Sequence, residues 1–363
     1  MNNPAQNPSA RTVEDHTKAT FRIALTGDFF ENGEPAYPDF DLAVLDDAPG
    51  IEYAAFAERH GEIEPDQLAG FQSVIVLSTR VTAHSLSRSE ELLAISRFGV
   101  GYDSVDVAAC TDANVVLCIS SGAVDRPVAE ATVGWMLALA YRTRVKDQIA
   151  RNGRWDRRSG FIGSGLRGRT LGVIGLGGIG RTVLRLLESF EMNRPLVFDP
   201  LLDEQAVAEL GGEKATLPEL MARSDFITVH CPLHEGTKDL ISAPELELMK
   251  PSAFLLNTAR GGIVNEDALF AALSDEQIAG AALDCFVEEP FNGPPRFAEL
   301  ENVILAPHNI AWTEDLFRDI GQMACQSLID LAHGRRPRGV VNPEVFDRPS
   351  FQEKWEAVRL PGE

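Results

Sequence analysis

The chain has 363 residues, of which 44% are hydrophobic and 24% are charged, and these values suit a globular protein of two domains. Its 33 Lys and Arg against 54 Asp and Glu give a formal net charge of −21, which disfavours nucleic acid and anionic lipid as partners. The N-terminus has no apolar signal region, and the longest uncharged apolar run, residues 131–141, is too short to span a bilayer.

The N-terminal third is predicted to be a small α/β domain. Residues 1–20 are polar and rich in turn formers, and we expect a disordered tail there. Short apolar runs predict three strands, and the segment Glu90–Ser96 between the last two has a helical pattern. The strands are Phe21–Leu25, Val74–Leu77 and Val115–Cys118.

The rest of the chain alternates helices with short, almost wholly apolar strands. Arg126–Arg151 is predicted to be one long helix, with Pro127 in its first turn and Gly153 just past its end. Alternation of this kind indicates a doubly wound parallel sheet with helices on both faces, and Gln322–Ala332 is predicted to be helical again. The strands expected in the sheet are Leu171–Ile174, Leu196–Phe198, Phe226–Val229, Ala253–Leu256, Ala281–Leu283 and Val303–Leu305.

A glycine-rich turn joins the first of these strands to a helix. The turn fits G-x-G-x-x-G, a weak signal alone, but a strand precedes it and an apolar-faced helix follows, as in dinucleotide-binding folds. Gly175 permits the tight turn, Gly177 lets the backbone approach a pyrophosphate, and Gly180 lets the helix pack against the strand. The helix N-terminus would present N–H groups to the phosphates. The predicted cofactor-binding residues here are Gly175, Gly177, Gly178, Ile179 and Gly180.

Asp199 ends the next strand, 19 residues after Gly180 (199 − 180). A carboxylate there accepts hydrogen bonds from the ribose hydroxyls and repels a 2′-phosphate, and no Arg or Lys follows in residues 200–203. The sequence therefore predicts NAD rather than NADP as the cofactor.

Three chemically complementary residues follow strands of the predicted sheet: Arg260, Glu289 and His308. Reduction of a 2-keto acid needs a fixed cation for the carboxylate and keto oxygen, a proton donor, and a group that keeps the donor charged. Arg, His and a carboxylate supply these functions. Singly, each residue has an ordinary interpretation, as a surface Arg, a solvated Glu or a structural His. Their joint position after a nucleotide motif favours catalysis.

From about Phe98 to His308 the chain resembles the D-isomer-specific 2-hydroxyacid dehydrogenases, a family that includes phosphoglycerate dehydrogenase, glyoxylate/hydroxypyruvate reductase and D-lactate dehydrogenase. Besides the glycine motif, the matching segments are FGVGYDSVD (98–106), VAEATVGWMLAL (128–139), HCPLHEGTKDLI (230–241), LLNTARGGIVNEDAL (255–269), ALDCFVEEP (282–290) and Pro307-His308.

The resemblance implies a role for each site residue. Arg260 would bind the substrate carboxylate and keto oxygen, while His308 would be the general acid in reduction and the base in oxidation, with Glu289 as its partner. Asp284 would hold the nicotinamide carboxamide, and we assign Thr258 to the cofactor as well. Backbone N–H groups near Val100 and Gly101 would hold the substrate carboxylate, and Ser78 is also assigned to the substrate.

The family architecture implies two Rossmann-like domains, in which the NAD-binding domain (122–327) is inserted into a smaller flavodoxin-like substrate-binding domain (21–121 and 328–363). It also implies a homodimer, to which Arg126–Arg151 contributes. The substrate would be a small 2-keto or 2-hydroxy acid; its identity and the physiological direction stay open.

Some residues argue against particular relatives. Members that act on phosphorylated substrates carry an Arg in the segment that here reads Val76–Thr79, so 3-phosphoglycerate is disfavoured. Glu289 in place of Gln argues against formate dehydrogenase, and Val100 in place of Lys argues against phosphite dehydrogenase. A nucleotide-sensing corepressor on the same fold is an alternative from another class, because such proteins can keep the same three residues.

Two further features bear on the site. Trp312 follows the catalytic His where small residues are common, and it either lines the substrate pocket or packs under the loop. The five cysteines are odd in number, widely spaced and without a Cys-x-x-Cys pair, so we expect free thiols, a reducing cytoplasmic compartment and no metal.

Overall fold

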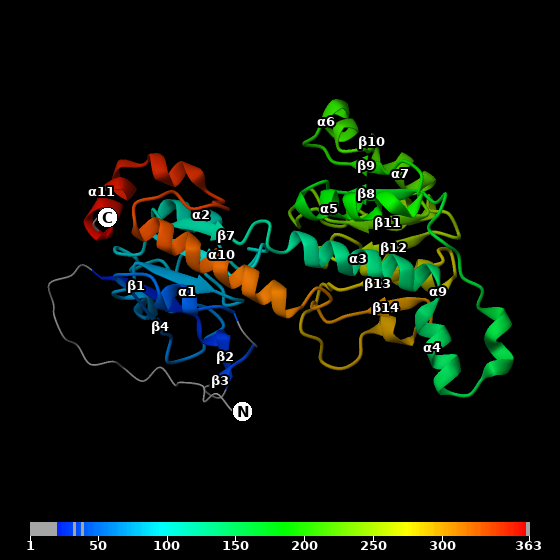
Figure 1. Cartoon of the computed structure of the whole chain (residues 1–363), viewed down its shortest axis with the longest axis horizontal. Helices are drawn as coiled ribbons and strands as arrows, with labels where there is room; N and C mark the ends of the chain where they lie inside the picture. Colours follow the sequence, from blue (N-terminus) through cyan, green and yellow to red (C-terminus); the bar gives the residue numbers. More distant parts are fainter. Residues whose placement is uncertain (1–19, 32–33, 38–39, 361–363) are drawn as a thin grey trace. The chain divides into compact units, whose positions relative to one another are not determined.

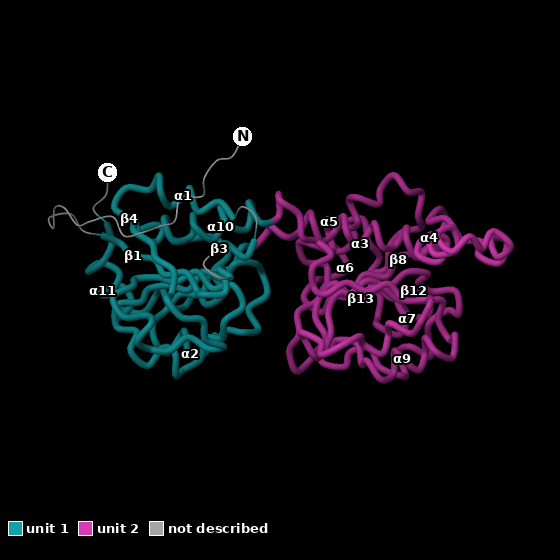
Figure 2. The backbone as a smooth tube through the Cα atoms, turned by 90° about the horizontal axis from the view of Figure 1, so that it is seen from below, with its two compact units in different colours: residues 1–120, 317–363 teal, residues 121–316 magenta. Residues whose placement is uncertain are grey.

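The computed structural model describes residues 20–31, 34–37 and 40–360, and these form two compact units. Unit 1 contains residues 1–120 and 317–363, and unit 2 contains residues 121–316 (Figure 2). The disordered tail predicted for residues 1–20 lies outside the described residues, apart from Thr20. In the part of the chain that is described, no helix has both the length and the apolar character needed to cross a membrane.

Unit 2 is built on a seven-stranded parallel sheet in the order β10-β9-β8-β11-β12-β13-β14 (Figure 1). The strands are β8 (Leu171–Ile174), β9 (Leu196–Phe198), β10 (Glu213–Lys214), β11 (Phe226–Val229), β12 (Phe254–Asn257), β13 (Gly280–Leu283) and β14 (Val303–Leu305). The helices are α3 (Asp125–Ala140), α4 (Thr143–Arg151), α5 (Gly178–Leu187), α6 (Glu204–Glu209), α7 (Leu217–Arg223), α8 (Ala243–Glu247) and α9 (Glu266–Ser274).

Successive residues of the central strands point into two different cores, which is why these strands are apolar throughout. Leu256 of β12 packs on one face with Met136 of α3 and Val183 of α5. Its neighbour Leu255 packs on the other face with Leu220 of α7, and α8 and α9 contribute to the same core. The predicted doubly wound parallel sheet is therefore confirmed.

Unit 1 is a smaller α/β unit with a five-stranded parallel sheet in the order β4-β1-β5-β6-β7. The strands are β1 (Phe21–Leu25), β4 (Ile51–Ala55), β5 (Ser73–Val76), β6 (Ala94–Arg97) and β7 (Val116–Ile119), and a two-residue pair, β2 (Phe30–Glu31) and β3 (Glu34–Pro35), lies outside this sheet. The helices are α1 (Ala43–Asp46), α2 (Val107–Asp112), α10 (Glu314–Ala332), whose first three residues belong to unit 2, and α11 (Pro349–Val358).

Two predicted helices are wrong. The predicted helix Arg126–Arg151 is two helices, because Arg142 adopts a left-handed conformation with φ 52° between α3 and α4. At this break the Ser164 N–H donates to the carbonyl of Ala140, so a crossing segment takes a bond that a continuous helix would make internally. The predicted helical segment Glu90–Ser96 contains instead the start of β6, an interior strand of its sheet. A strand buried on both faces is apolar at every position, so its sequence cannot be told from that of a buried helix.

Candidate active site

The three proposed catalytic residues follow three neighbouring strands of the unit 2 sheet. Arg260 comes after β12, Glu289 after β13 and His308 after β14, and these strands are adjacent and parallel. Because the carboxyl ends of parallel strands lie at one edge of the sheet, residues far apart in sequence are brought to the same edge.

The loops that carry Arg260 and Glu289 touch through their backbones. A Cβ added to Gly261 would lie 2.0 Å from the carbonyl carbon of Phe286, so only glycine permits this approach. The Cys285 thiol also donates to the carbonyl of Ala259 at 3.3 Å. The residues next to Arg260 are thereby held against the first part of the loop that follows β13 and carries Glu289.

His308 and Glu289 form a direct hydrogen bond. Nδ1 of His308 lies 2.6 Å from Oε2 of Glu289, and Oε1 of the same carboxylate accepts the Phe286 N–H at 2.6 Å. An ionised carboxylate can only accept, so Nδ1 donates and Nε2 is the ring nitrogen that remains for a substrate. The side chains of His308 and Glu289 are 44% and 32% exposed, so the pair is within reach of a ligand.

The surroundings of Glu289 favour its charged form. Partial burial raises the pKa of this carboxyl, but hydrogen bonds from His308 and Phe286 and the positive charges of His308 and Arg260 lower the pKa to below its usual value. Glu289 therefore stays ionised as the acceptor for His308. Arg260, whose loop follows the strand next to that of Glu289, contributes one of these positive charges.

The backbone of His308 is in an unusual conformation that its neighbours hold in place. Its φ is 54°, in the left-handed region, and its N–H donates to the carbonyl of Asp284 at 2.8 Å. Oδ1 of Asp284 accepts the N–H groups of Asn309 and Ile310 at 2.9 and 3.1 Å. Burial raises the pKa of Asp284, while these backbone bonds and the charge of His308 oppose the rise. Strain held in this way is common where a side chain must be aimed.

The loop of Arg260 is fixed by a buried residue that sequence analysis missed. The side-chain amide of Asn257 donates to the carbonyl of Arg260 at 2.8 Å, and its oxygen accepts the Ala259 N–H at 3.1 Å. The Arg260 guanidinium donates to the carbonyl of Ala259 at 2.6 Å. A signal was present in the sequence, because Asn257 is the one polar residue of an otherwise apolar strand.

The glycine motif has the backbone shape that a pyrophosphate needs. Gly175 has φ 89°, and a Cβ there would lie 2.7 Å from the Cys231 nitrogen. A Cβ on Gly180 would lie 2.5 Å from the Gly175 carbonyl oxygen, as the predicted close packing requires. Gly177 directly precedes α5 as its N-cap, and within the described residues no atom lies within 4 Å of a Cβ built on it. The residues present therefore fit a dinucleotide phosphate at this helix N-terminus.

The other predicted cofactor residues surround this turn or the catalytic loops. Oδ2 and Oδ1 of Asp199 accept the N–H groups of Leu176 and Leu201 at 2.8 and 2.9 Å, which leaves lone pairs for ribose hydroxyls. Gly178 lies against the carboxylate of Asp125, and Ile179 packs on the core beneath α5. Thr258 is buried, with its hydroxyl 3.5 Å from that of Thr132.

The predicted substrate residues of unit 1 follow two neighbouring strands, Ser78 after β5 and Val100 and Gly101 after β6. The N–H and hydroxyl of Ser78 both donate to Oδ2 of Asp28, at 2.8 and 2.7 Å. Burial raises the pKa of Asp28, but these and other hydrogen bonds lower it below its usual value, so the carboxylate is ionised. With its proton donated to Asp28, the Ser78 hydroxyl can act toward a substrate only as a hydrogen-bond acceptor.

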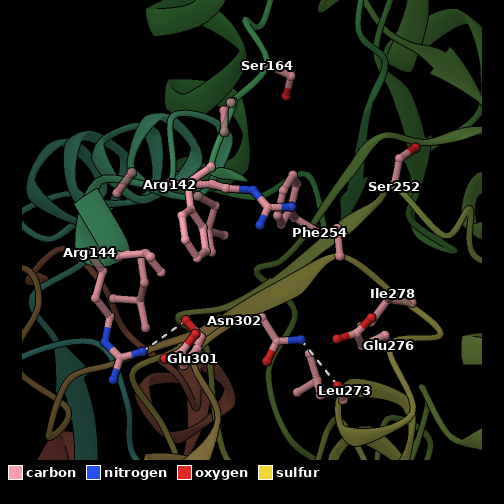
Figure 3. A pocket seen from close by; sticks show the side chains of 18 of the residues that line it. Arg142, Arg144, Ser164, Ser252, Phe254, Leu273, Glu276, Ile278, Glu301 and Asn302 are labelled. Atoms are coloured by element: carbon pink, nitrogen blue, oxygen red, sulfur yellow. Dashed lines mark hydrogen bonds between the residues drawn. The ribbon is translucent and has the colours of Figure 1, made fainter. Parts of the chain in front are cut away.

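A pocket of about 820 Å³ lies elsewhere in unit 2 (Figure 3). It is lined by Arg142 and Arg144 near the break between α3 and α4, and by residues at the amino ends of strands, such as Phe254 and Asn302. Arg144 donates to the carbonyls of Leu300 and Glu301 at 3.2 and 3.0 Å. The pocket is at the edge of the sheet opposite to that of His308 and is separate from the catalytic residues.

Comparison with known proteins gives consistent matches. Residues 133–309 match the family model described as D-isomer specific 2-hydroxyacid dehydrogenase, NAD binding domain. D-3-phosphoglycerate dehydrogenase of Methanocaldococcus jannaschii is 38% identical over 85% of this chain, but the match spans only 58% of that relative's length. Glyoxylate reductase of Thermococcus litoralis is 34% identical over 75% of this chain and 84% of its own length.

Solved structures agree with these matches. The structure of D-lactate dehydrogenase from Aquifex aeolicus, described as complexed with NAD and lactic acid, superposes with a TM-score of 0.73 at 25% identity. The match covers 86% of this chain and 96% of that one.

Proposed function

We propose that this chain, which belongs to the D-isomer specific 2-hydroxyacid dehydrogenase family, transfers a hydride between NAD(H) and a small 2-keto acid or its D-2-hydroxy acid. The observation that supports the proposal best is the 2.6 Å hydrogen bond between His308 and Glu289. The loop that carries Glu289 contacts the loop that carries Arg260. Acid, partner carboxylate and cation are the three groups that this reaction requires.

In the proposed mechanism, bound NADH supplies the hydride. Arg260 holds the substrate carboxylate and keto oxygen, because its planar guanidinium contacts two oxygens at once. Nε2 of His308 donates a proton to the keto oxygen in reduction and accepts it back in oxidation. Glu289 keeps the ring oriented and favours its protonated form.

The other assigned residues bind the two ligands. We assign to the cofactor Gly175, Gly177, Gly178, Ile179, Gly180, Asp199, Thr258 and Asp284. We assign to the substrate Val100, Gly101 and Ser78 in addition to Arg260. Asp199 makes NADH the preferred reductant, because its carboxylate would face the 2′-phosphate of NADPH.

The experiment is a substrate panel of glyoxylate, hydroxypyruvate, pyruvate and larger keto acids, each with NADH and with NADPH. Loss of NADH absorbance with at least one keto acid is the expected result, and chiral analysis should show a D product for every substrate other than glyoxylate, whose product glycolate is achiral. No turnover of any keto acid, or an L product, contradicts the proposal. Faster reaction with NADPH contradicts only the role of Asp199.

We further propose a homodimer formed through α4 and the segment that follows it. The described residues of α4 and of the 3-10 helix Trp155–Gly160 include no buried residue, and Trp155 is 68% and Ile162 83% exposed. This arm extends from the body of unit 2 (Figure 2), next to the pocket of Figure 3. Exposed apolar surface of this kind favours association with another protein. We commit to a second copy of this chain as that protein, because most soluble oligomers are formed from identical chains.

Light scattering with size-exclusion chromatography tests the dimer. The wild-type chain should elute as a dimer, and Trp155→Asp combined with Ile162→Asp should elute as a monomer of unchanged circular dichroism. A dimer that survives both substitutions places the interface elsewhere.

We also propose a reducing, cytoplasmic compartment, with neither nucleic acid nor membrane as a partner. All five cysteines are thiols, and burial raises the pKa of Cys118 to about 12, so that this thiol resists oxidation. A fluorescent fusion followed by cell fractionation tests this, and export of the fusion would contradict it.

A further inference from the structure

Cys285 adds a third metal-binding group to the pair that the proposed mechanism uses. Ligand atoms of Cys285, Glu289 and His308 all lie within 4.8 Å of one another. Cys285 is 3% exposed, whereas the side chains of Glu289 and His308 are 32% and 44% exposed. The thiol therefore forms the floor of the cluster, and the carboxylate and imidazole form its open side.

Thiolate, imidazole and carboxylate are the donors that Zn²⁺ uses in proteins, at about 2.3, 2.0–2.1 and 2.0–2.2 Å. Around a tetrahedral ion these lengths place ligand atoms about 3.3–3.6 Å apart. The sulfur, at most 4.8 Å from the other two ligand atoms, must approach by up to roughly 1.3 Å on that basis. The bonded His308 and Glu289 atoms, now 2.6 Å apart, must separate by roughly 0.7 Å. Binding therefore requires a side-chain rotation of Cys285 and an opening of the pair.

We propose that Cys285, Glu289 and His308 form an inhibitory site for a thiophilic divalent cation such as Zn²⁺. The ion takes a ring nitrogen of His308 and an oxygen of Glu289, and water occupies its fourth position. The proton that the pair shares and the thiol proton of Cys285 leave to solvent, with no change of oxidation state. Nδ1 is the ring nitrogen that gives up the shared proton, so the metal-bound ring of His308 is neutral and keeps only its Nε2 proton. That proton is far less acidic than the proton of an imidazolium, so His308 no longer acts as the acid toward a keto acid. This inhibition depends on the proposed function, whereas metal binding itself does not.

The structure also limits the strength of the site. The Cys285 thiol must give up its hydrogen bond to the Ala259 carbonyl. The positive charge of Arg260, on the loop that touches the loop of Cys285, repels the ion. Binding should thus be reversible by a chelator, unlike binding at a closed structural zinc site.

Cobalt provides a readout that needs no turnover. Co²⁺ added to the metal-free protein should produce a thiolate-to-cobalt charge-transfer band that saturates at one equivalent. The band should disappear in Cys285→Ser and in His308→Ala, and it should persist in Cys231→Ser, the matched control because Cys231 is partly exposed in the same unit. A band that survives in Cys285→Ser, or no band in the wild type, overturns the proposal.

Inhibition tests the consequence. Zn²⁺ alone should inhibit keto-acid reduction, with recovery on adding EDTA. Each protein is compared with its own metal-free rate, and Cys285→Val should need at least tenfold more Zn²⁺ than the wild type for half inhibition. Equal sensitivity of the two proteins overturns the proposal. If no keto acid is reduced, the proposed function fails, and the cobalt spectra still decide on the site.

Discussion

His230, which directly follows β11, makes the protein sensitive to acid in a way that one substitution can reveal. Its Nε2 lies 2.9 Å from the Thr228 hydroxyl, and its Nδ1 is buried without a partner in the described structure. Burial lowers the pKa of His230 from 6.5 to about 3, because a charged ring would lose its hydration there. The perturbation that tests this is His230→Gln, which keeps a donor and acceptor for Thr228 but does not titrate.

The magnitude follows from proton linkage. Below pH 6.5 the unfolded chain takes up a proton at this position, whereas the folded chain does so only near pH 3, so stability falls as the pH falls between these values. Each unit of pH in this window is worth about 1.4 kcal/mol. At pH 6.5 the ring is already half protonated in the unfolded chain. Lowering the pH from 6.5 to about 4.5 therefore reduces the free energy of unfolding by about 2 kcal/mol.

Urea unfolding at several pH values in this window measures the effect, since contributions from all other groups cancel between wild type and variant. The wild type should lose about 2 kcal/mol more of its free energy of unfolding than His230→Gln. His84→Gln is the control, because the side chain of His84 is 62% exposed and carries little burial cost. Equal losses in wild type and His230→Gln would refute the reasoning.

Four further substitutions test the site. Arg260→Ala should raise the keto-acid concentration needed for half-maximal rate and slow turnover. Arg260→Lys should restore only part of the loss, because an ammonium group cannot bind two oxygens bidentately. Steady-state kinetics near those of the wild type in either variant would contradict the role. Glu289→Gln should slow keto-acid reduction more at about pH 8 than at about pH 6, because the anion that favours protonated His308 is gone. A pH profile of unchanged shape would argue against the pairing of His308 with Glu289. Trp312 is 49% exposed, so part of its ring is open to a ligand. If it lines the pocket, Trp312→Ala should shift kcat/KM toward longer keto acids, and an unchanged preference removes it from the pocket. Gly261→Ala should lower both Tm and activity, since its Cβ would lie 2.0 Å from Phe286, and wild-type values in thermal and kinetic assays would disprove the contact.

Most strands of the inserted sheet could be predicted from the sequence because each is a short run of apolar residues. β8, β9, β11 and β14 begin and end where the apolar runs do. The same logic fails for β4, an edge strand that is largely exposed, and for β6, whose apolar run is equally typical of a buried helix. The break at Arg142 could not be foreseen either, because neither a glycine nor a proline marks it and the crossing segment at Ser164 is distant in sequence.

The catalytic residues were identifiable from their place after strands, but their contacts were not. The hydrogen bond of His308 with Glu289 follows from strand order, which fixes β13 beside β14. Asn257 stands out as the polar residue at the end of an apolar strand, but its bond to the Arg260 carbonyl is visible only in the fold. Gly261 acts through a close backbone approach that no side-chain pattern shows. Cys285 fits no metal motif by spacing, because its partners come from two different loops, and only the fold places the three together.

The most direct test of the account is His308→Ala, assayed for NADH-dependent reduction of the best keto acid of the panel alongside NADH binding measured by fluorescence. The account predicts that turnover falls at least about a hundredfold, the lower end for loss of a general acid, while NADH affinity changes little. Near-full activity in this variant would contradict the assignment of His308 as the group that gives and takes the substrate proton.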